Sequence, residues 1–219
     1  MLNNYHEKLD EIKQEIEDIG NELLSSNRLL LQAIDGCNQD VFTNAKSHLK
    51  NISKKTNNID NNIVKTLALH SPEARDLRAM VAYLKITNEL LRASSNTRTF
   101  IKGFGDVCNE IDTKIIKEYA IPMQKFTIDA LDFSLQMLNV ECVDECGELY
   151  NNVLVAENKT DDLFALLESN VLQNAHEIED FKKYHKIIRS LRKSEKIADR
   201  AMSIASLFLY AINGGEINH

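Results

Sequence analysis

Two pairs of acidic residues in the second half of this chain have the chemistry and the spacing of a metal site. They are Glu157 with Asp161 and Glu195 with Asp199. Residues four apart lie on one face of a helix, so each pair presents two carboxylates in the same direction. Carboxylates brought close together raise one another's pKa, and a bound cation reverses that cost. Oxygen ligands of this kind suit Mg²⁺, Ca²⁺ or Mn²⁺, and carboxylate-rich helical bundles also hold iron.

A plainer interpretation of the same spacing stands beside this one. The pattern E-x-x-x-D is common in helices, and four ordinary acids on solvated faces would also produce it. A helical-wheel count places Leu191 and Ala198 on the apolar face of their helix, with Glu195 and Asp199 at its border. We therefore expect that neutralising Glu195 and Asp199 leaves folding intact and lowers the metal content.

The helix that carries the later pair of acids repeats an earlier segment of the chain. Residues 71–96 realign without gaps on residues 175–200, and several acidic, basic and apolar positions coincide. An internal repeat of this length indicates that the chain consists of two related halves.

The two halves differ in the residues that could bind a cation. Leu91 and Ser95 stand where the second half has its later acidic pair. Thr56 and Asp60 stand where it has its earlier pair. Asp60 is the one acid of the set that the first half retains, and it is a weak candidate ligand.

The same helix also carries a stripe of basic residues away from the acids. The stripe consists of Lys182, Lys186, Arg189, Lys193 and Lys196. The formal net charge of the chain is −7, so a basic stripe is unusual in it. Two interpretations fit equally well, a solvated face with salt bridges to neighbouring helices and a docking surface for an acidic partner.

The composition indicates an all-helical protein. Seven glycines and two prolines among 219 residues leave long stretches without a helix breaker, and 43% hydrophobic residues suffice for a sizeable core. We expect six helices, over residues 4–35, 39–69, 71–102, 108–139, 143–172 and 175–213. The fourth of them is expected to bend at Pro122. Gly214 and Gly215 are expected to close the sixth.

Long helices joined by short turns must pack side by side and antiparallel. Two sets of three helices predict two tandem three-helix bundles, over residues 1–105 and 106–219, with Gly103-Phe104-Gly105 as the joint. A single six-helix bundle is the alternative.

Four cysteines are present, but a large helical core does not need disulfides, so we expect none. Cys142 and Cys146 have helical spacing, and two thiols alone make an incomplete metal site. We interpret them as small buried thiols.

Charge and missing motifs exclude several classes of function. An acidic chain is a poor partner for nucleic acid. No apolar run approaches the ~20 residues that span a bilayer, and no signal-peptide pattern is present, so we expect a cytoplasmic protein without a transmembrane segment. The chain also contains no P-loop, no G-x-G-x-x-G, no G-x-S-x-G and no H-E-x-x-H.

Three segments resemble the signature of the PhoU family of phosphate-uptake regulators. SPEARDLR at 71–78 is similar to that family's P-x-A-x-D-L-R turn, and LKI at 84–86 follows it as in the family. EKIAD at 195–199 looks like the family's E-R-I-G-D element, with Lys for Arg and Ala for Gly. The resemblance covers the whole chain.

This resemblance implies a fold, a site and a role. It implies two three-helix repeats and metal ligation by Glu157, Asp161, Glu195 and Asp199, with Fe, Zn, Mn or Mg as the metal. It implies a dimeric regulator rather than an enzyme, which acts beside the bacterial inner membrane. Such a regulator would restrain a phosphate ABC transporter and a phosphate-sensing histidine kinase. The alternatives are a carboxylate-bundle metalloenzyme and a purely structural helical scaffold.

Overall fold

The computed structural model describes residues 2–70, 72–174 and 178–214, and the regular structure within these ranges is helical throughout. The first half contains α1 (Leu2–Gly36), α2 (Gln39–Ser47), α3 (Ile52–Leu69) and α4 (Ala74–Gly105). The second half contains α5 (Thr113–Ile115), α6 (Ile121–Gln136), α7 (Val143–Asn174) and α8 (Ile178–Asn213). The predicted all-helical class is confirmed.

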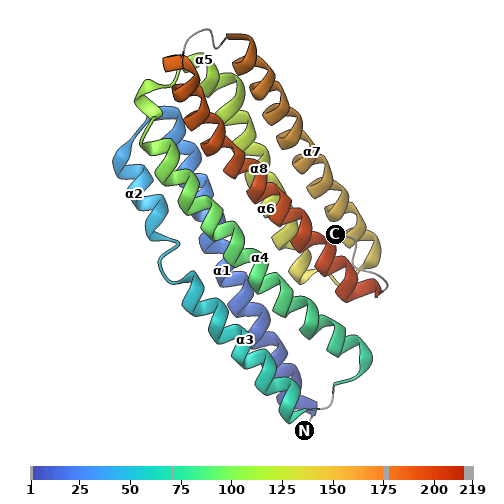
Figure 1. Cartoon of the computed structure of the whole chain (residues 1–219). Helices are drawn as coiled ribbons and strands as arrows, with labels where there is room; N and C mark the ends of the chain where they lie inside the picture. The colour runs from blue at the N-terminus through green and yellow to red at the C-terminus, as the bar shows by residue number, and fades with distance from the viewer. Residues whose placement is uncertain (1, 71, 175–177, 215–219) are drawn as a thin grey trace.

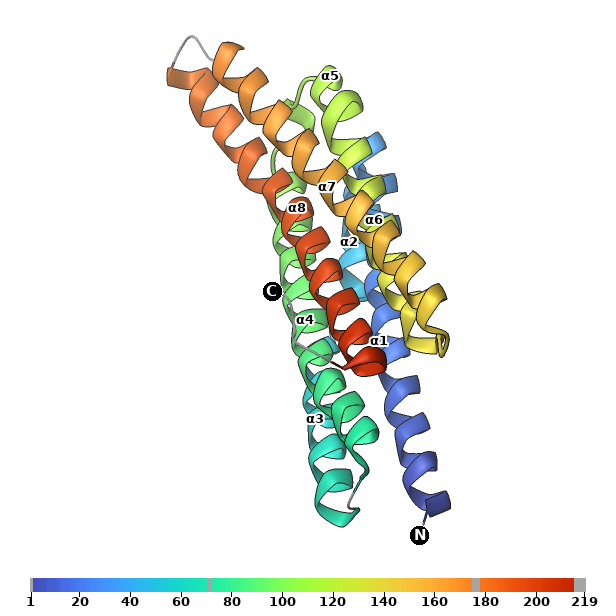
Figure 2. The ribbon, with the colours of Figure 1, turned by 90° about the vertical axis from the view of Figure 1, so that its right-hand side faces the viewer.

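The helices form two groups that share one long contact. α1, α3 and α4 pack together, with α2 beside the far end of α4, and α6, α7 and α8 form the second group (Figure 1). α4 and α8 run side by side between the groups and make the most extensive helix–helix contact of the molecule (Figure 2). One apolar core extends through both groups. A division into domains at residues 105 and 106 stays a prediction.

The helices form because each one buries an apolar stripe with helical spacing. In α1, Ile12, Ile16, Ile19 and Leu23 are almost completely buried. Burial of one such side chain stabilises the fold by roughly 1.5–3 kcal/mol, which far exceeds the differences in intrinsic helix propensity. Within the described residues, no helix combines the length and the apolar character that crossing a bilayer requires.

The single helix expected over residues 39–69 is wrong, because the chain breaks between α2 and α3. The backbone N–H groups of Leu49 and Lys50 donate to carbonyls only three residues earlier, so the last turn of α2 tightens and ends. The carbonyl of Leu49 accepts a hydrogen bond from the Arg98 side chain on α4. Leu49 is fully buried at this break. A contact across 49 residues therefore interrupts a helix that local periodicity would continue.

The helix expected over residues 108–139 also differs from the prediction. Residues Cys108–Glu110 form a 3₁₀ turn, and the long helix begins only at Thr113, where the Asp112 side chain accepts from the N–H of Lys114. One π-helical turn then precedes Pro122, at Ile116–Ala120. Proline has no N–H to donate, and a wider turn accommodates this loss within a continuing helix.

The cysteines also differ from the prediction. Cys37 and Cys108 form a disulfide, with their Cα atoms 5.6 Å apart. The bond joins the end of α1 to the segment that follows α4. The sequence pattern does not predict that these two segments are close together. Cys146 is buried as expected, whereas Cys142 is exposed just before α7.

The structure describes part of two predicted helix ends, the C-terminal end of the sixth helix and the start of the third. Gly214 has a φ of +72° after α8, and its N–H donates to the carbonyl of Tyr210, so it closes that helix as expected. Residues 175–177 and Gly215 lie outside the described residues. In the first half, α4 begins at Ala74, three residues later than the start expected at residue 71.

Candidate metal centre

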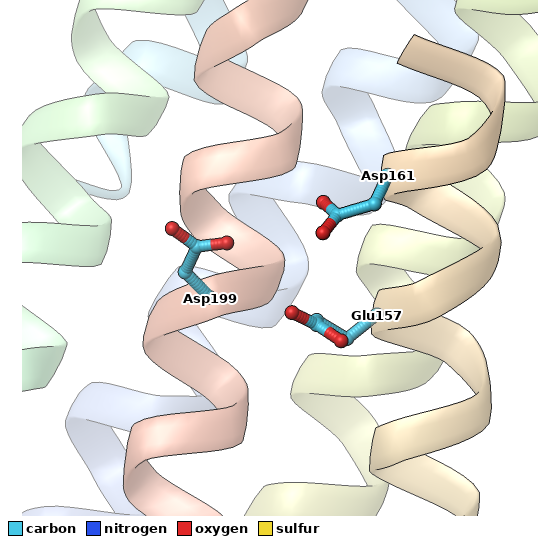
Figure 3. A group of neighbouring side chains, drawn as sticks. All are labelled: Glu157, Asp161 and Asp199. Carbon is cyan, nitrogen blue, oxygen red and sulfur yellow. The ribbon is translucent and has the colours of Figure 1, made fainter. Parts of the chain in front are cut away.

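Carboxylates from α7 and α8 converge on one point between these two helices. Glu157 and Asp161 project from α7 toward Asp199 on α8 (Figure 3). One oxygen of each of the three carboxylates lies within 4.8 Å of the others. The α7 pair is one helical turn apart, so both members reach the same point. Three of the four acids that the sequence predicted are therefore brought together.

Glu195, the fourth predicted acid, lies beside this group. Its side chain is 12% exposed, and one carboxylate oxygen accepts from the ammonium of Lys196 at 3.0 Å. The other oxygen is buried without a hydrogen-bond partner. An orphaned buried carboxylate oxygen is costly unless a cation or a donor reaches it.

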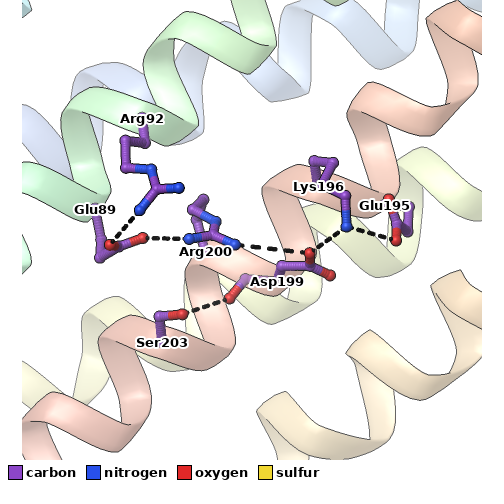
Figure 4. Close-up of polar contacts among 7 residues, drawn as sticks. All are labelled: Glu89, Arg92, Glu195, Lys196, Asp199, Arg200 and Ser203. Atoms are coloured by element: carbon purple, nitrogen blue, oxygen red, sulfur yellow. Dashed lines mark hydrogen bonds and ion pairs between the residues drawn. The ribbon is translucent and has the colours of Figure 1, made fainter. Parts of the chain in front are cut away.

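Lys196 faces the acids and not the basic stripe in which the sequence analysis placed it. Its ammonium donates to Asp199 at 2.7 Å as well as to Glu195 (Figure 4). Burial lowers the pKa of Lys196, but the two hydrogen bonds outweigh that effect and the pKa is raised overall. One positive charge is therefore built into the acidic cluster.

Electrostatics show how strongly the acids interact. Burial is the main reason why the pKa of Glu157 is raised, followed by the charges of Asp161, Asp199 and Glu195. Burial likewise raises the pKa of Asp161, with Glu195 and Asp199 as the next causes. In each case Lys196 offsets only part of the effect. The cluster carries more negative charge than its own lysine balances.

Hydrogen bonds buried between α6 and α8 fix the direction in which the α8 acids point. Ser194 donates to the side-chain carbonyl of Gln124 at 3.1 Å, and its hydroxyl lies 2.9 Å from that of Thr127. All three residues are fully buried. Because Ser194 is held against α6, the next residue, Glu195, must turn toward α7.

An ion pair that the sequence analysis missed connects the cluster to the first half of the chain. Arg200 donates to Glu89 on α4 at 3.0 Å and lies 3.7 Å from Asp199 (Figure 4). Glu89 also accepts from Arg92 at 3.3 Å. The two residues are 111 positions apart, so the local spacing of residues could not predict this contact.

The donors of the cluster suit a hard cation. Three convergent carboxylates and one unsatisfied carboxylate oxygen supply the oxygen ligands that Mg²⁺, Mn²⁺ and iron accept. Among the described residues, no histidine or cysteine joins the group. The chemistry of the residues present therefore fits a metal of this class, and it fits the nitrogen and sulfur preference of structural zinc less well.

The sequence of this chain matches no family model. It is 24% identical to the phosphate-specific transport system accessory protein PhoU homolog of Pseudomonas aeruginosa, over 98% of this chain and 90% of that protein. It is 19% identical to the PhoU homolog 1 of Methanothermobacter thermautotrophicus, over 95% of this chain and 94% of that protein.

Solved structures share the fold over nearly the whole chain. PhoU from Pseudomonas aeruginosa matches with a TM-score of 0.77 at 19% identity, over 96% of this chain and all of that one. The phosphate transport system regulatory protein PhoU from Streptococcus pneumoniae matches with a TM-score of 0.79 at 15% identity, over 98% and 99% of the two chains. The curated relatives and the solved structures together support the resemblance to the PhoU family, and the fold is the one that the PhoU structures have.

The acidic pairs of the second half have no counterpart in the first half. Asp60 on α3 accepts a hydrogen bond from the Thr87 hydroxyl on α4 at 2.6 Å. Thr56 is buried, and the Ser95 hydroxyl donates to the carbonyl of Leu91. Within the described part of the chain, these positions assemble no group of acids. Metal ligation by Asp60 stays a prediction.

The other residues of the predicted basic stripe lie on α8 before the two acids, nearer to the start of the helix. Lys182, Lys186 and Arg189 are exposed, and Lys193 is half-buried. Contact of these residues with a partner stays a prediction.

Proposed function

We propose that this chain is a regulatory accessory protein of a phosphate transport system, acting in the cytoplasm. It restrains a phosphate ABC transporter and a phosphate-sensing histidine kinase when phosphate is plentiful. The observation that carries the proposal is the similarity over the full length to proteins named for this role. Because both chains are covered almost completely, the similarity extends to the whole protein and not to one shared module.

The proposed action requires protein contacts and no chemical turnover. Partners of this type are the transporter ATPase and the kinase, and a homodimer would present each binding surface twice. Rigid helices suit such an adaptor, because packed side chains fix the positions of distant surfaces relative to one another.

Deletion of the gene tests this role. We expect the deletion strain to accumulate phosphate and to express alkaline phosphatase in phosphate-rich medium, where the wild type represses both. Affinity capture of the tagged chain from phosphate-rich and phosphate-starved cells should recover the transporter ATPase and the kinase. Unchanged phosphate accumulation and alkaline phosphatase expression in the deletion strain would refute the regulatory role.

We further propose that the carboxylate cluster binds a metal ion, with iron, manganese and magnesium favoured over zinc. Glu157, Asp161 and Asp199 would supply the first ligands, and the unsatisfied oxygen of Glu195 would complete them. Burial and then repulsion among the acids raise the pKa of Glu157 and Asp161, and a bound cation would offset both effects.

Elemental analysis of the purified protein tests the metal proposal. We expect Asp161→Asn/Asp199→Asn to lower the bound metal at least ten-fold while the circular dichroism stays unchanged. Asp144→Asn/Glu148→Gln is the matched control, because it removes the same charge from two exposed positions on α7 outside the cluster and should leave the metal content unchanged. Equal metal content in the cluster variant and the wild type would show that the cluster is not the site.

A further inference from the structure

A second polar site lies on the other side of α8, where this helix crosses the end of α4. A groove of about 310 Å³ opens there. Its α8 wall carries Lys186, Arg189 and Lys193, and its α4 side is formed by Thr99 and Gly103 with Asp106 at the end of the helix. None of these residues belongs to the carboxylate cluster.

Three cations of the groove are left without a counter-charge from the protein. Lys186, Arg189 and Lys193 share one face of α8, because they are spaced by three and four residues. Within the part of the chain that the structure describes, none of the three forms an ion pair, whereas Lys196 and Arg200 on the same helix do. Unpaired cations are common in this chain, but these three differ in that they line one groove together.

The negative groups that face these cations do not balance them. Asp106 is exposed at the edge of the groove and forms no ion pair with them. The end of α4 adds the partial negative charge of a helix C-terminus, which equals about half an elementary charge. Three full positive charges against one carboxylate and this partial charge leave the groove net positive.

The floor of the groove is the place where α4 and α8 are in close contact. α4 and α8 approach so closely that a Cβ added at Gly103 would lie 2.8 Å from the hydroxyl oxygen of Ser190. That hydroxyl donates to the carbonyl of Lys186, which ties it to α8. The volume between the two helical walls is large enough for a compact ligand.

We infer that this groove binds a phosphoryl-type oxyanion. Arg189 offers paired donors that match two oxygens of such a group, and the flanking lysines add compact positive charges. Lys182, on the same face, has other contacts in the structure and is not part of the site. The inference does not depend on the regulatory role or on the metal centre, since its residues are separate from both.

Titration of the full-length protein with inorganic phosphate in a metal-free buffer tests this site. We expect saturable binding by isothermal titration calorimetry and a rise in Tm with phosphate concentration. Lys186→Gln/Arg189→Gln/Lys193→Gln should weaken the binding at least ten-fold. Lys54→Gln/Lys117→Gln/Lys125→Gln is the control, because it removes the same charge from exposed positions outside the groove and should keep the affinity of the wild type.

Two further arms identify the source of the phosphoryl group. Phosphatidylcholine vesicles with and without phosphatidic acid test a lipid headgroup, and a hexaglutamate peptide tests carboxylates. Binding of phosphate or of phosphatidic acid vesicles that the groove variant loses supports the inference and names the source. Binding of hexaglutamate alone, equal binding by the groove variant and the control, or no binding of any probe overturns it.

Discussion

The pKa values of the Glu157 and Asp161 side chains are raised in the folded protein. The stability of the metal-free protein therefore depends on pH. A carboxyl group with a raised pKa in the folded state contributes stability that is fully present below its unfolded pKa, near 4. That contribution is lost as the pH rises through the raised folded pKa. The cluster therefore opposes folding most strongly at neutral pH when no cation is bound.

Glu157→Gln/Asp161→Asn should reverse this effect. We expect the double variant to exceed the wild type in free energy of unfolding at pH 7, in the presence of a chelator, and to lose this advantage near pH 4. The gain should be at most about 1 kcal/mol, because solvent screens the partly exposed carboxylates. Urea denaturation followed by circular dichroism across this pH range measures it.

Excess Mn²⁺ supplies the matched comparison. The metal should raise the unfolding midpoint of the wild type at pH 7 and leave that of the double variant unchanged. A double variant that is less stable than the wild type at pH 7 without metal would contradict the repulsion derived from the structure.

A few polar contacts buried between the long helices determine how each helix is rotated about its axis. Gln124 on α6 donates to the backbone and side-chain oxygens of Asn27 on α1, at 3.3 and 3.0 Å, and accepts from Ser194 on α8. Asn27 in turn donates to Thr97 on α4. Each of these groups lies in the interior, so the helices must keep the rotation about their axes that satisfies all of them.

Gln124→Leu should destabilise the fold and disturb the metal cluster together. Leucine keeps most of the volume but leaves the buried side-chain oxygen of Asn27 without its donor, which costs about 1–3 kcal/mol, while Ser194 keeps its contact with Thr127. Gln136→Leu, at the exposed end of α6, should change stability by less than about 0.5 kcal/mol. The urea midpoint measures the first effect, and metal content per chain measures the second. Equal midpoints for the two variants would remove the proposed role of the network.

At the scale of single helices, the sequence predicted the features that depend only on residues of the same helix. The apolar face of α8 followed from Ile187, Leu191 and Ala198, and all three are buried. The break before α3 could not be predicted, because it depends on Arg98, a residue on another helix that contacts the carbonyl of Leu49. The acids of the candidate site were visible as E-x-x-x-D pairs, whereas the Lys196 contacts depend on how its side chain turns.

Across the whole molecule, the disulfide is the contact that was hardest to predict from the sequence. Cys37 and Cys108 are 71 residues apart, and each lies next to a helix end where the chain changes direction. Composition argued against a covalent link because the core is large. The start of α2 contacts the end of α4 beside the bond, where Gln39 donates to the carbonyl of Gly105 at 2.9 Å and Phe42 lies against Phe104, so packing between helices brings the two sulfur atoms together.

Cys37→Ser/Cys108→Ser should lower the free energy of unfolding by about 2–4 kcal/mol under oxidising conditions, since the link closes a long loop in the unfolded chain. Dithiothreitol should lower the urea midpoint of the wild type to the same level and leave the double variant unaffected. Cys142→Ser, which removes an exposed free thiol, is the control and should keep the wild-type midpoint. A double variant as stable as the oxidised wild type would show that the bond adds nothing.

α8 carries the acidic cluster toward α7 and the basic groove toward α4, so this one helix forms a wall of both sites. Both sites include side chains of one continuous helix, so a shift of α8 at the cluster also moves the residues that line the groove. A cation that draws α8 toward α7 would therefore change the width of the groove. By reciprocity, an anion seated in the groove would alter the affinity for the cation by the same factor.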